Sequence, residues 1–330
     1  MVTSCVRGLL FARGASAAIV ACLWFGGVAA AQEGWPDRPI RMLISFPPGG
    51  SSDAIARIVQ PGLEKRLGQP IVLESRPGAG GMIAIDAVAR AAPDGYTIGL
   101  GGAGALGGNV ALGEKTSYDP RKDVAPVTVL SASPFILAAA PWFAGKSVPD
   151  IIALSKREKT AIGHGGNGTL MHLTAEMFNQ MARTKLPLIP YRGIAPVVTD
   201  LIGGHVALGI VDPPSAVAAI EGGKINAVAI SSAARFPRLK DVPTFAEQGL
   251  PGFESFGWFG IVAPAKTPPA VVARLNAALV AELNEPSVVE RIRALGAEPM
   301  PQTPAEFSAF IVREIDKWTK VVAASGGLPK

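Results

Sequence analysis

Cysteine is nearly absent from this sequence of 330 residues, because its two cysteines, Cys5 and Cys22, both lie near the amino terminus. Residues 1–31 have the features of a cleavable secretory signal peptide: Arg7 and Arg13 supply positive charge, an apolar stretch follows, and three alanines end the segment. Removing this segment would leave a chain without any thiol. That absence excludes a cysteine nucleophile, a cysteine-ligated zinc site and a disulfide scaffold.

A long apolar run is also missing, because the stretch at 15–28 is shorter than the roughly 20 residues that a spanning helix needs. We therefore expect the mature protein to work outside the cytoplasm. Residues 19–22 resemble a lipobox, but the residues after Cys22 stay apolar where a lipid tether is usually polar. No lipid anchor at Cys22 is expected.

Histidine is scarce, with only His164, His172 and His205. The first two lack the i, i+4 spacing that places two metal ligands on one helix face, so no metal site is expected. The serine nucleophile motif G-x-S-x-G is absent, which argues against a serine hydrolase. The motif G-x-G-x-x-G occurs three times, but 38 glycines make chance matches expected, and the residues after the first two matches make a poor helix. We therefore predict no dinucleotide and no other cofactor.

Strong positive charge is absent too. The formal net charge of +5 falls to about +3 without Arg7 and Arg13, and the sequence has no basic run of five residues. Few aromatic residues lie among the basic ones. A nucleic-acid partner is therefore not expected.

Strand-like and helix-like segments alternate through the rest of the chain, which predicts an α/β protein with βαβ units and a mainly parallel sheet covered by helices on both faces. The predicted strands lie at 40–46, 71–74, 97–100, 160–163, 186–190, 207–211, 225–230 and 257–263. The predicted helices lie at 53–67 and 82–91, near the starts 169, 194 and 213, and at 269–283, 286–295 and 304–323.

Two stretches without clear periodicity, near 126–134 and 231–243, are candidate crossovers between two lobes. They would place residues 32–130 plus 240–330 in lobe 1 and residues 131–239 in lobe 2. Two such lobes form a cleft that suits a small ligand and hinge closure. Trp258 and Phe259 lie in an apolar strand and are predicted to be core residues.

The most informative local pattern is a strand that ends in a Pro-Pro-Gly-Gly turn before a helix. Glycines let the backbone approach a ligand, and free N–H groups at a helix start suit an anion. Ser51, Ser52 and Asp53 are good N-cap residues, so an ordinary capped helix start is the alternative interpretation. The candidate ligand contacts here are Pro48, Gly49, Gly50, Ser51 and Ser52.

A second glycine-rich helix start occurs in the other predicted lobe, with Gly166, Asn167 and Thr169 as candidate contacts. Two such starts facing each other could hold both ends of a dicarboxylate, or a carboxylate and a carbonyl, without a buried cation.

Three polar residues follow predicted strands in lobe 2. Asp212 either accepts a hydrogen bond from a ligand or caps the helix that begins near Pro213. Tyr191 is a candidate contact, and Arg192 is either a ligand cation or a solvated loop residue, the second being favoured.

Seven short motifs occur in an order that resembles the Bug family of periplasmic solute receptors, which are related to tripartite tricarboxylate transporters. They are FPPGG at 46–50, RPGAGG at 76–81, APDGYT at 92–97, GNGT at 166–169, PYRG at 190–193, DVPT at 241–244 and LGAEP at 295–299.

The resemblance implies a two-lobed periplasmic-binding-protein (Venus-flytrap) fold that closes around a small carboxylated organic solute. It also implies that the loop matching Ala103, Gly104 and Ala105 completes the pocket, together with the other candidate contacts. The sequence departs from the family pattern at His164, which could select an unusual acid, at the two prolines after Asp212, and in a loop at 101–109 that is rich in glycine and alanine.

We therefore expect a periplasmic solute-binding protein without catalytic activity. Its partners would be the solute and the membrane subunits of a tripartite tricarboxylate-type transporter. Two alternatives remain at this point: a sensor subunit that reports ligand occupancy to a signalling protein, and a secreted carboxylic-ester hydrolase.

Overall fold

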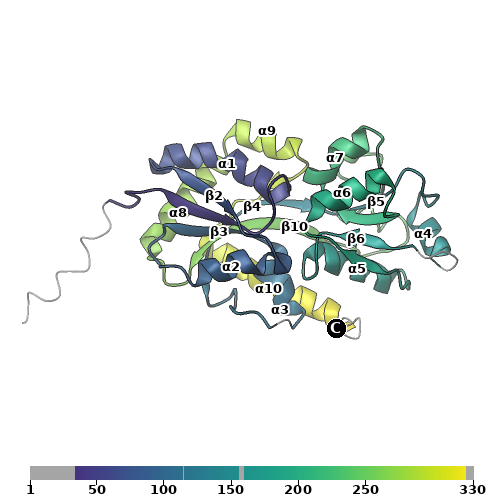
Figure 1. The fold of residues 1–330 in the computed structure, drawn as a ribbon, viewed down its shortest axis with the longest axis horizontal. Coiled ribbons are helices and arrows are strands. Elements are labelled where there is room, and N and C mark those ends of the chain that lie inside the picture. Colours follow the sequence, from purple (N-terminus) through teal and green to yellow (C-terminus); the bar gives the residue numbers. More distant parts are fainter. Residues whose placement is uncertain (1–33, 114, 156–159, 325–330) are drawn as a thin grey trace, which may run out of the picture.

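The structure is a computed structural model that describes residues 34–113, 115–155 and 160–324. The predicted signal peptide at 1–31 and the expectation about Cys22 lie outside the described residues. Two β-sheets lie side by side along the long axis of the molecule and define two lobes, each with helices packed around its sheet (Figure 1). The predicted two-lobed α/β architecture is confirmed.

The first sheet has six strands in the order β11-β4-β10-β3-β1-β2. Strand β1 pairs in parallel with β2 and β3, whereas β10 is antiparallel to both β3 and β4. The bounds are β1 (Ile40–Ile44), β2 (Ile71–Ser75), β3 (Thr97–Gly102), β4 (Val124–Pro134), β10 (Phe256–Pro264) and β11 (Glu298–Pro299).

The second sheet has five strands in the order β7-β6-β8-β5-β9. Strand β6 is parallel to β7 and β8, whereas β5 is antiparallel to β8 and β9. The bounds are β5 (Ile136–Ala139), β6 (Ile162–His164), β7 (Leu188–Pro190), β8 (Leu208–Val211) and β9 (Asn226–Ile230).

Both sheets are mixed, so the prediction of a mainly parallel sheet is wrong. The chain leaves the first sheet through β4, enters the second through β5 with only Phe135 between, and returns through β10. Strand β4 carries the chain out of the first sheet and its neighbour β10 carries it back, so these two strands run in opposite directions. The antiparallel pairs are therefore a consequence of the two-lobed connection.

The stretch at 126–134 belongs to strand β4, which has two register shifts against β10 and leads through Phe135 into the second sheet. Its proline and hydroxyl residues hid the pattern, and Pro126 lies beside a register irregularity in the β4–β10 pairing. Proline is tolerated at such a point because it has no N–H to donate to the ladder.

Most predicted helices are present within a few residues of the expected bounds. The last three begin at or next to a proline, where the missing N–H costs no helical hydrogen bond. The helices are α1 (Ser51–Leu67), α2 (Met82–Ala89), α3 (Asn109–Ala111), α4 (Val148–Leu154), α5 (Leu170–Met181), α6 (Ile194–Gly203), α7 (Pro213–Glu221), α8 (Pro269–Leu283), α9 (Pro286–Ala294) and α10 (Pro304–Ala324), with short turns η1 (Ala79–Gly81), η2 (Gly104–Gly108) and η3 (Pro237–Leu239).

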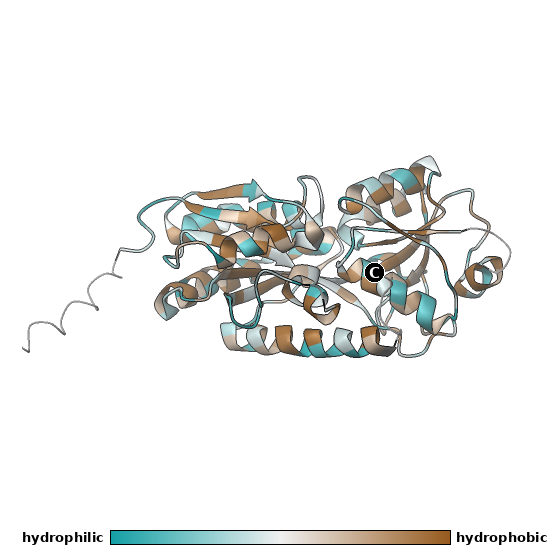
Figure 2. Cartoon of the chain, turned by 60° about the horizontal axis from the view of Figure 1, so that its bottom comes forward, coloured by the Kyte–Doolittle hydropathy of each residue, from teal (hydrophilic) through white to brown (hydrophobic). Residues whose placement is uncertain are grey.

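Apolar side chains form a cluster confined to each lobe and a third cluster that runs through both. The third cluster joins Val129 and Trp258 of the first sheet to Leu137 and Ile210 of the second. The strands are mainly apolar and the helices carry mixed apolar and polar residues (Figure 2). Among the described residues, the helices are too short or too polar to cross a membrane.

Candidate functional site

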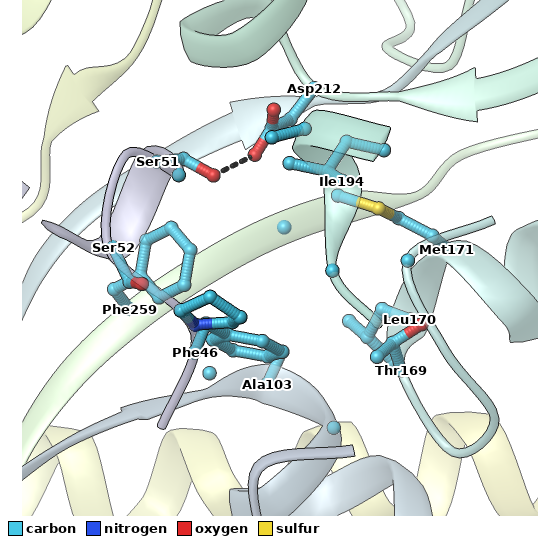
Figure 3. Close-up of a pocket in the computed structure, with 18 of the residues that line it drawn as sticks. Phe46, Ser51, Ser52, Ala103, Thr169, Leu170, Met171, Ile194, Asp212 and Phe259 are labelled. Carbon is cyan, nitrogen blue, oxygen red and sulfur yellow. Dashed lines mark hydrogen bonds between the residues drawn. The ribbon is translucent and has the colours of Figure 1, made fainter. Parts of the chain in front are cut away.

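A pocket with a cavity volume of about 80 Å³ lies between the two lobes. Residues of lobe 1 and lobe 2 face each other across it (Figure 3). The lining consists of Phe46, Pro47, Pro48, Gly50, Ser51, Ser52, Gly102, Ala103, Gly104, Ser133, Phe135, Gly165, Thr169, Leu170, Met171, Arg192, Gly193, Ile194, Ala195, Pro196, Asp212, Gly257, Trp258 and Phe259.

The amino-terminal end of α1 opens into this pocket. Its N-cap is Gly50, which supplies no side chain, and the backbone N–H groups of Ser51 and Ser52 have no hydrogen-bond acceptor among the described residues. The prediction that Ser51 or Ser52 caps this helix is therefore wrong: both lie in its first turn. Unsatisfied N–H groups and the positive end of the helix dipole meet here, which is the arrangement that binds an anion.

Ser52 adds a side-chain donor to the same place. Its side chain is 1% exposed, and its Oγ has no hydrogen-bond partner among the described residues. Figure 3 places Ser52 beside Phe46 and Phe259 at the pocket. A buried hydroxyl without a partner is costly, so a ligand acceptor would satisfy a group that the fold leaves unpaired.

The first turn of α1 also holds a carboxylate that is already neutralised. Asp53 accepts the N–H of Gly49 at 3.1 Å and forms an ion pair with Arg57 at 3.0 Å. Burial opposes its charged form, but these hydrogen bonds outweigh burial and lower the pKa of Asp53. The turn before α1 is tight, and Gly49 adopts φ +82° there, a conformation that favours glycine. Gly49 itself does not line the pocket.

Asp212 reaches the same pocket from lobe 2. Its carboxylate is 2% exposed, accepts a hydrogen bond from the Ser51 hydroxyl across the lobe boundary, and accepts the N–H of Ser215 at 3.2 Å. It thus caps α7, which was one of the two predicted roles. No described cation forms an ion pair with Asp212. Burial raises the pKa of Asp212, and it outweighs the hydrogen bonds from Ser51 and Ser215, which lower that pKa.

The glycine-rich loop before α5 closes the other side. Thr169 caps α5 by accepting the N–H of His172 at 3.3 Å, and its hydroxyl donates to the Gly166 carbonyl at 2.7 Å. Of the predicted contacts in this loop, Thr169 lines the pocket, whereas Gly166 and Asn167 do not. Instead, the loop meets lobe 1: a Cβ on Gly80 would lie 2.7 Å from the Asn167 carbonyl oxygen.

The segment predicted as a loop at 101–109 is a short helical turn, η2, which continues into α3. Its glycines allow close contact with lobe 2, because a Cβ on Gly104 would lie 2.6 Å from the Gly168 carbonyl oxygen. Ala103 and Gly104 line the pocket as the resemblance implied. Ala105 does not, and its carbonyl accepts the Tyr118 hydroxyl at 2.6 Å.

His164 lies behind the pocket rather than in its lining. Its ring stacks on His172 with 4.7 Å between ring centroids, and its Nδ1 lies 3.1 Å from the Gly166 carbonyl oxygen. Burial, with a smaller contribution from His172, lowers the pKa of His164 to about 4. His172 lies 3.8 Å from Glu176. No group of three potential metal ligands occurs among the described residues.

Tyr191 also lies outside the lining. Its hydroxyl donates to Asp200 at 2.8 Å, and burial together with that bond raises its pKa to about 12. Arg192 lines the pocket but its side chain is exposed, and it is the only cation in the lining. The structure therefore places Arg192 at the rim of the pocket rather than inside it.

Sequence reasoning missed the apolar residues that give the pocket its walls. Phe46 and Phe259 pack edge to face with 6.3 Å between ring centroids, and Leu170, Met171 and Ile194 lie opposite them (Figure 3). Trp258 and Phe259 were expected to be core residues. Trp258 is buried and also lines the pocket, whereas Phe259 is only partly buried. Nothing in the local sequence distinguishes a wall residue from a core residue.

A family model described as the tripartite tricarboxylate transporter family receptor matches residues 55–327. The chain is 37% identical over 305 residues to protein BugT of Bordetella pertussis. The matched region covers 91% of this chain and 94% of BugT.

Solved structures of similar proteins have the same fold. MatC (Rpa3494) from Rhodopseudomonas palustris with bound malate is 34% identical, with a TM-score of 0.83 over 87% of this chain and all (100%) of that one. Rpa4515 of R. palustris with adipate is 33% identical, with a TM-score of 0.85 over 90% of this chain and 100% of that one.

Proposed function

Because this chain belongs to the tripartite tricarboxylate transporter receptor family, whose members include Bug-type solute-binding proteins, we propose that it is a periplasmic receptor for a small carboxylated solute. The solute would bind between the lobes and then pass to the membrane subunits of a tripartite tricarboxylate-type transporter. The observation that carries this proposal is the uncapped start of α1, which offers free backbone N–H groups and the unpartnered Ser52 hydroxyl to the pocket between the lobes.

The chemistry of that site favours a carboxylate. Backbone donors are fixed by the fold and need no buried cation, so binding avoids the cost of desolvating a charged side chain. Each hydrogen bond to a charged group contributes on the order of 1.5–3 kcal/mol. The malate and adipate in the related structures are also carboxylates, which supports the same class of solute.

The proposal includes no catalytic step. Fold and family are those of periplasmic solute-binding proteins. The histidine pair that could have served a nucleophile is turned away from the lining, with His164 bonded to a backbone carbonyl.

A thermal-shift screen of organic acids tests the proposal, using the methyl ester of each acid as the matched control. A ligand at 100 times its Kd stabilises a protein by about 2.7 kcal/mol. We expect at least one free acid to raise the melting temperature while its ester does not. If no acid does so, the proposed function is wrong.

Ser52→Ala provides the second measurement. It removes one donor to a charged group, so affinity for the acid should fall roughly 10- to 150-fold, which corresponds to about 1.5–3 kcal/mol. The empty protein should melt no lower than wild type, because the Ser52 hydroxyl has no described partner to lose. An unchanged affinity would remove Ser52 from the site.

A further inference from the structure

Asp212 is the one acidic side chain in the pocket lining, and it is buried without a counter-ion. The cations beside the pocket do not pair with it: Arg57 pairs with Asp53, and the side chain of Arg192 is exposed. An isolated buried charge is strongly disfavoured, so Asp212 either takes up a proton or gains a cationic partner. Among the described residues, no cation fills that second role, which leaves it open to a ligand.

The position of Asp212 relative to the anion site is informative. Ser51 belongs to both: its backbone N–H is one of the free donors at the start of α1, and its side-chain hydroxyl donates to Asp212. The two subsites are thus separated by no more than one serine residue. A ligand can use both if it carries a negative and a positive group on adjoining carbons, as a 2-amino acid does.

Apart from Arg192, whose side chain is exposed, the rest of the lining has no charged side chain. Phe46 and Phe259 form one wall, and Leu170, Met171 and Ile194 form the other (Figure 3). The helix starts at α5 and α7 carry side-chain caps, from Thr169 and Asp212, whereas α1 does not. A second carboxylate on the solute would lie against these apolar walls or near Asp212.

We propose that the solute is a 2-amino acid with an apolar side chain, whose carboxylate binds at the start of α1 and whose ammonium pairs with Asp212. This inference rests on the proposed function and narrows its solute class. The ammonium supplies the counter-ion that the buried carboxylate lacks, and the side chain lies between the two apolar walls.

Titration calorimetry of the mature protein with a matched set of acids tests the proposal. The set is L-valine, D-valine, 3-methylbutanoate (valine without its amino group), malate and adipate. We expect one valine enantiomer to bind at least tenfold more tightly than 3-methylbutanoate, malate and adipate. Equal binding of 3-methylbutanoate, or tighter binding of either dicarboxylate, would overturn the amino-acid assignment while leaving the proposed receptor function intact.

Asp212→Asn is the diagnostic variant. Asparagine can still cap α7 and accept from Ser51, but it carries no charge. Affinity for valine should fall at least tenfold, and affinity for 3-methylbutanoate should change by less than threefold. A loss that is equal for both acids would mean that Asp212 is structural and would refute the ammonium pairing.

Ser51→Ala is the matched control, because it keeps the Asp212 charge and loses only the contact between the lobes. The preference of this variant for valine over 3-methylbutanoate should persist even if its affinity for both is lower. Loss of the preference here would count against Asp212 as its source. The ligand series on the wild-type protein decides the matter independently if Asp212→Asn fails to fold.

Discussion

Gly104→Ala should weaken solute binding without destabilising the empty protein. Gly104 lies in η2 with a negative φ, and an added Cβ would lie 2.6 Å from the Gly168 carbonyl oxygen and 3.0 Å from Thr169 Cα. Both atoms are backbone atoms of the opposite lobe. A Cβ at position 104 therefore clashes when the lobes lie as close together as they do in this structure, and the clash would be relieved if they moved apart.

The magnitude follows from two opposing terms. In a helical turn, alanine is favoured over glycine by about 0.5–1 kcal/mol, and this gain is present whether the lobes are open or closed. Overpacking at a tight contact costs roughly 1–3 kcal/mol, and this cost is paid only on closure. The apparent affinity should therefore fall about 5- to 150-fold.

Gly107→Ala is the matched control on the same helical turn. A Cβ there would lie 3.7 Å from Ile315 and 3.8 Å from Glu314, which is ordinary van der Waals contact within lobe 1. Titration calorimetry should show a normal Kd for this variant, and small-angle scattering should show normal compaction with ligand. The reasoning is refuted if Gly104→Ala binds like wild type, or if both alanine variants lose affinity equally.

Three further predictions follow from the same region. Thr169→Val should cost the empty protein about 0.5–2 kcal/mol in chemical unfolding through loss of the α5 cap, and Thr169→Ser should restore it. The pKa of His164 falls from 6.5 to about 4 on folding, because burial favours the neutral ring. Above pH 6.5 the ring is neutral in both states and the folded protein incurs no penalty. As the pH falls towards 4, the unfolded chain gains a proton that the folded protein does not, so the free energy of unfolding decreases. The free energy of unfolding of wild type should therefore fall by up to about 3 kcal/mol more than that of His164→Asn between these pH values. Arg192→Ala should reduce affinity by no more than roughly fivefold, with a smaller effect at high salt, because the side chain is exposed; a larger, salt-independent loss would place Arg192 inside the site.

Comparing wild type with His164→Asn isolates the effect of His164 on stability from that of two carboxyl groups, Asp212 and Glu176, whose protonation at low pH stabilises the fold. Burial raises the pKa of Asp212 and of Glu176, so protonating them as the pH falls favours the folded state. These groups are present in both wild type and His164→Asn, and their contribution cancels in the difference.

The sequence alone determined the local elements and their order. Helix and strand periodicity, proline at helix starts and glycine at turns are short-range signals, and they placed α8 at residues 269–283 and began α6 and α7 at the observed residues. The ordered motifs led to the correct family. A helix start after two glycines at the end of a strand also followed from a local pattern, whereas the absence of a side-chain cap there did not.

Only the tertiary structure decided how the lobes meet. Strand direction depends on which strands carry the chain between the two sheets, and this is a long-range property. The burial of His164 behind the loop and the presence of Phe259 at the pocket likewise depend on packing between distant segments. Asp212 and Ser51 are 161 residues apart, and no local pattern relates them. Their contact exists because the packing of the two lobes brings two helix starts together, and this is why the pocket's charge arrangement could be found only in three dimensions.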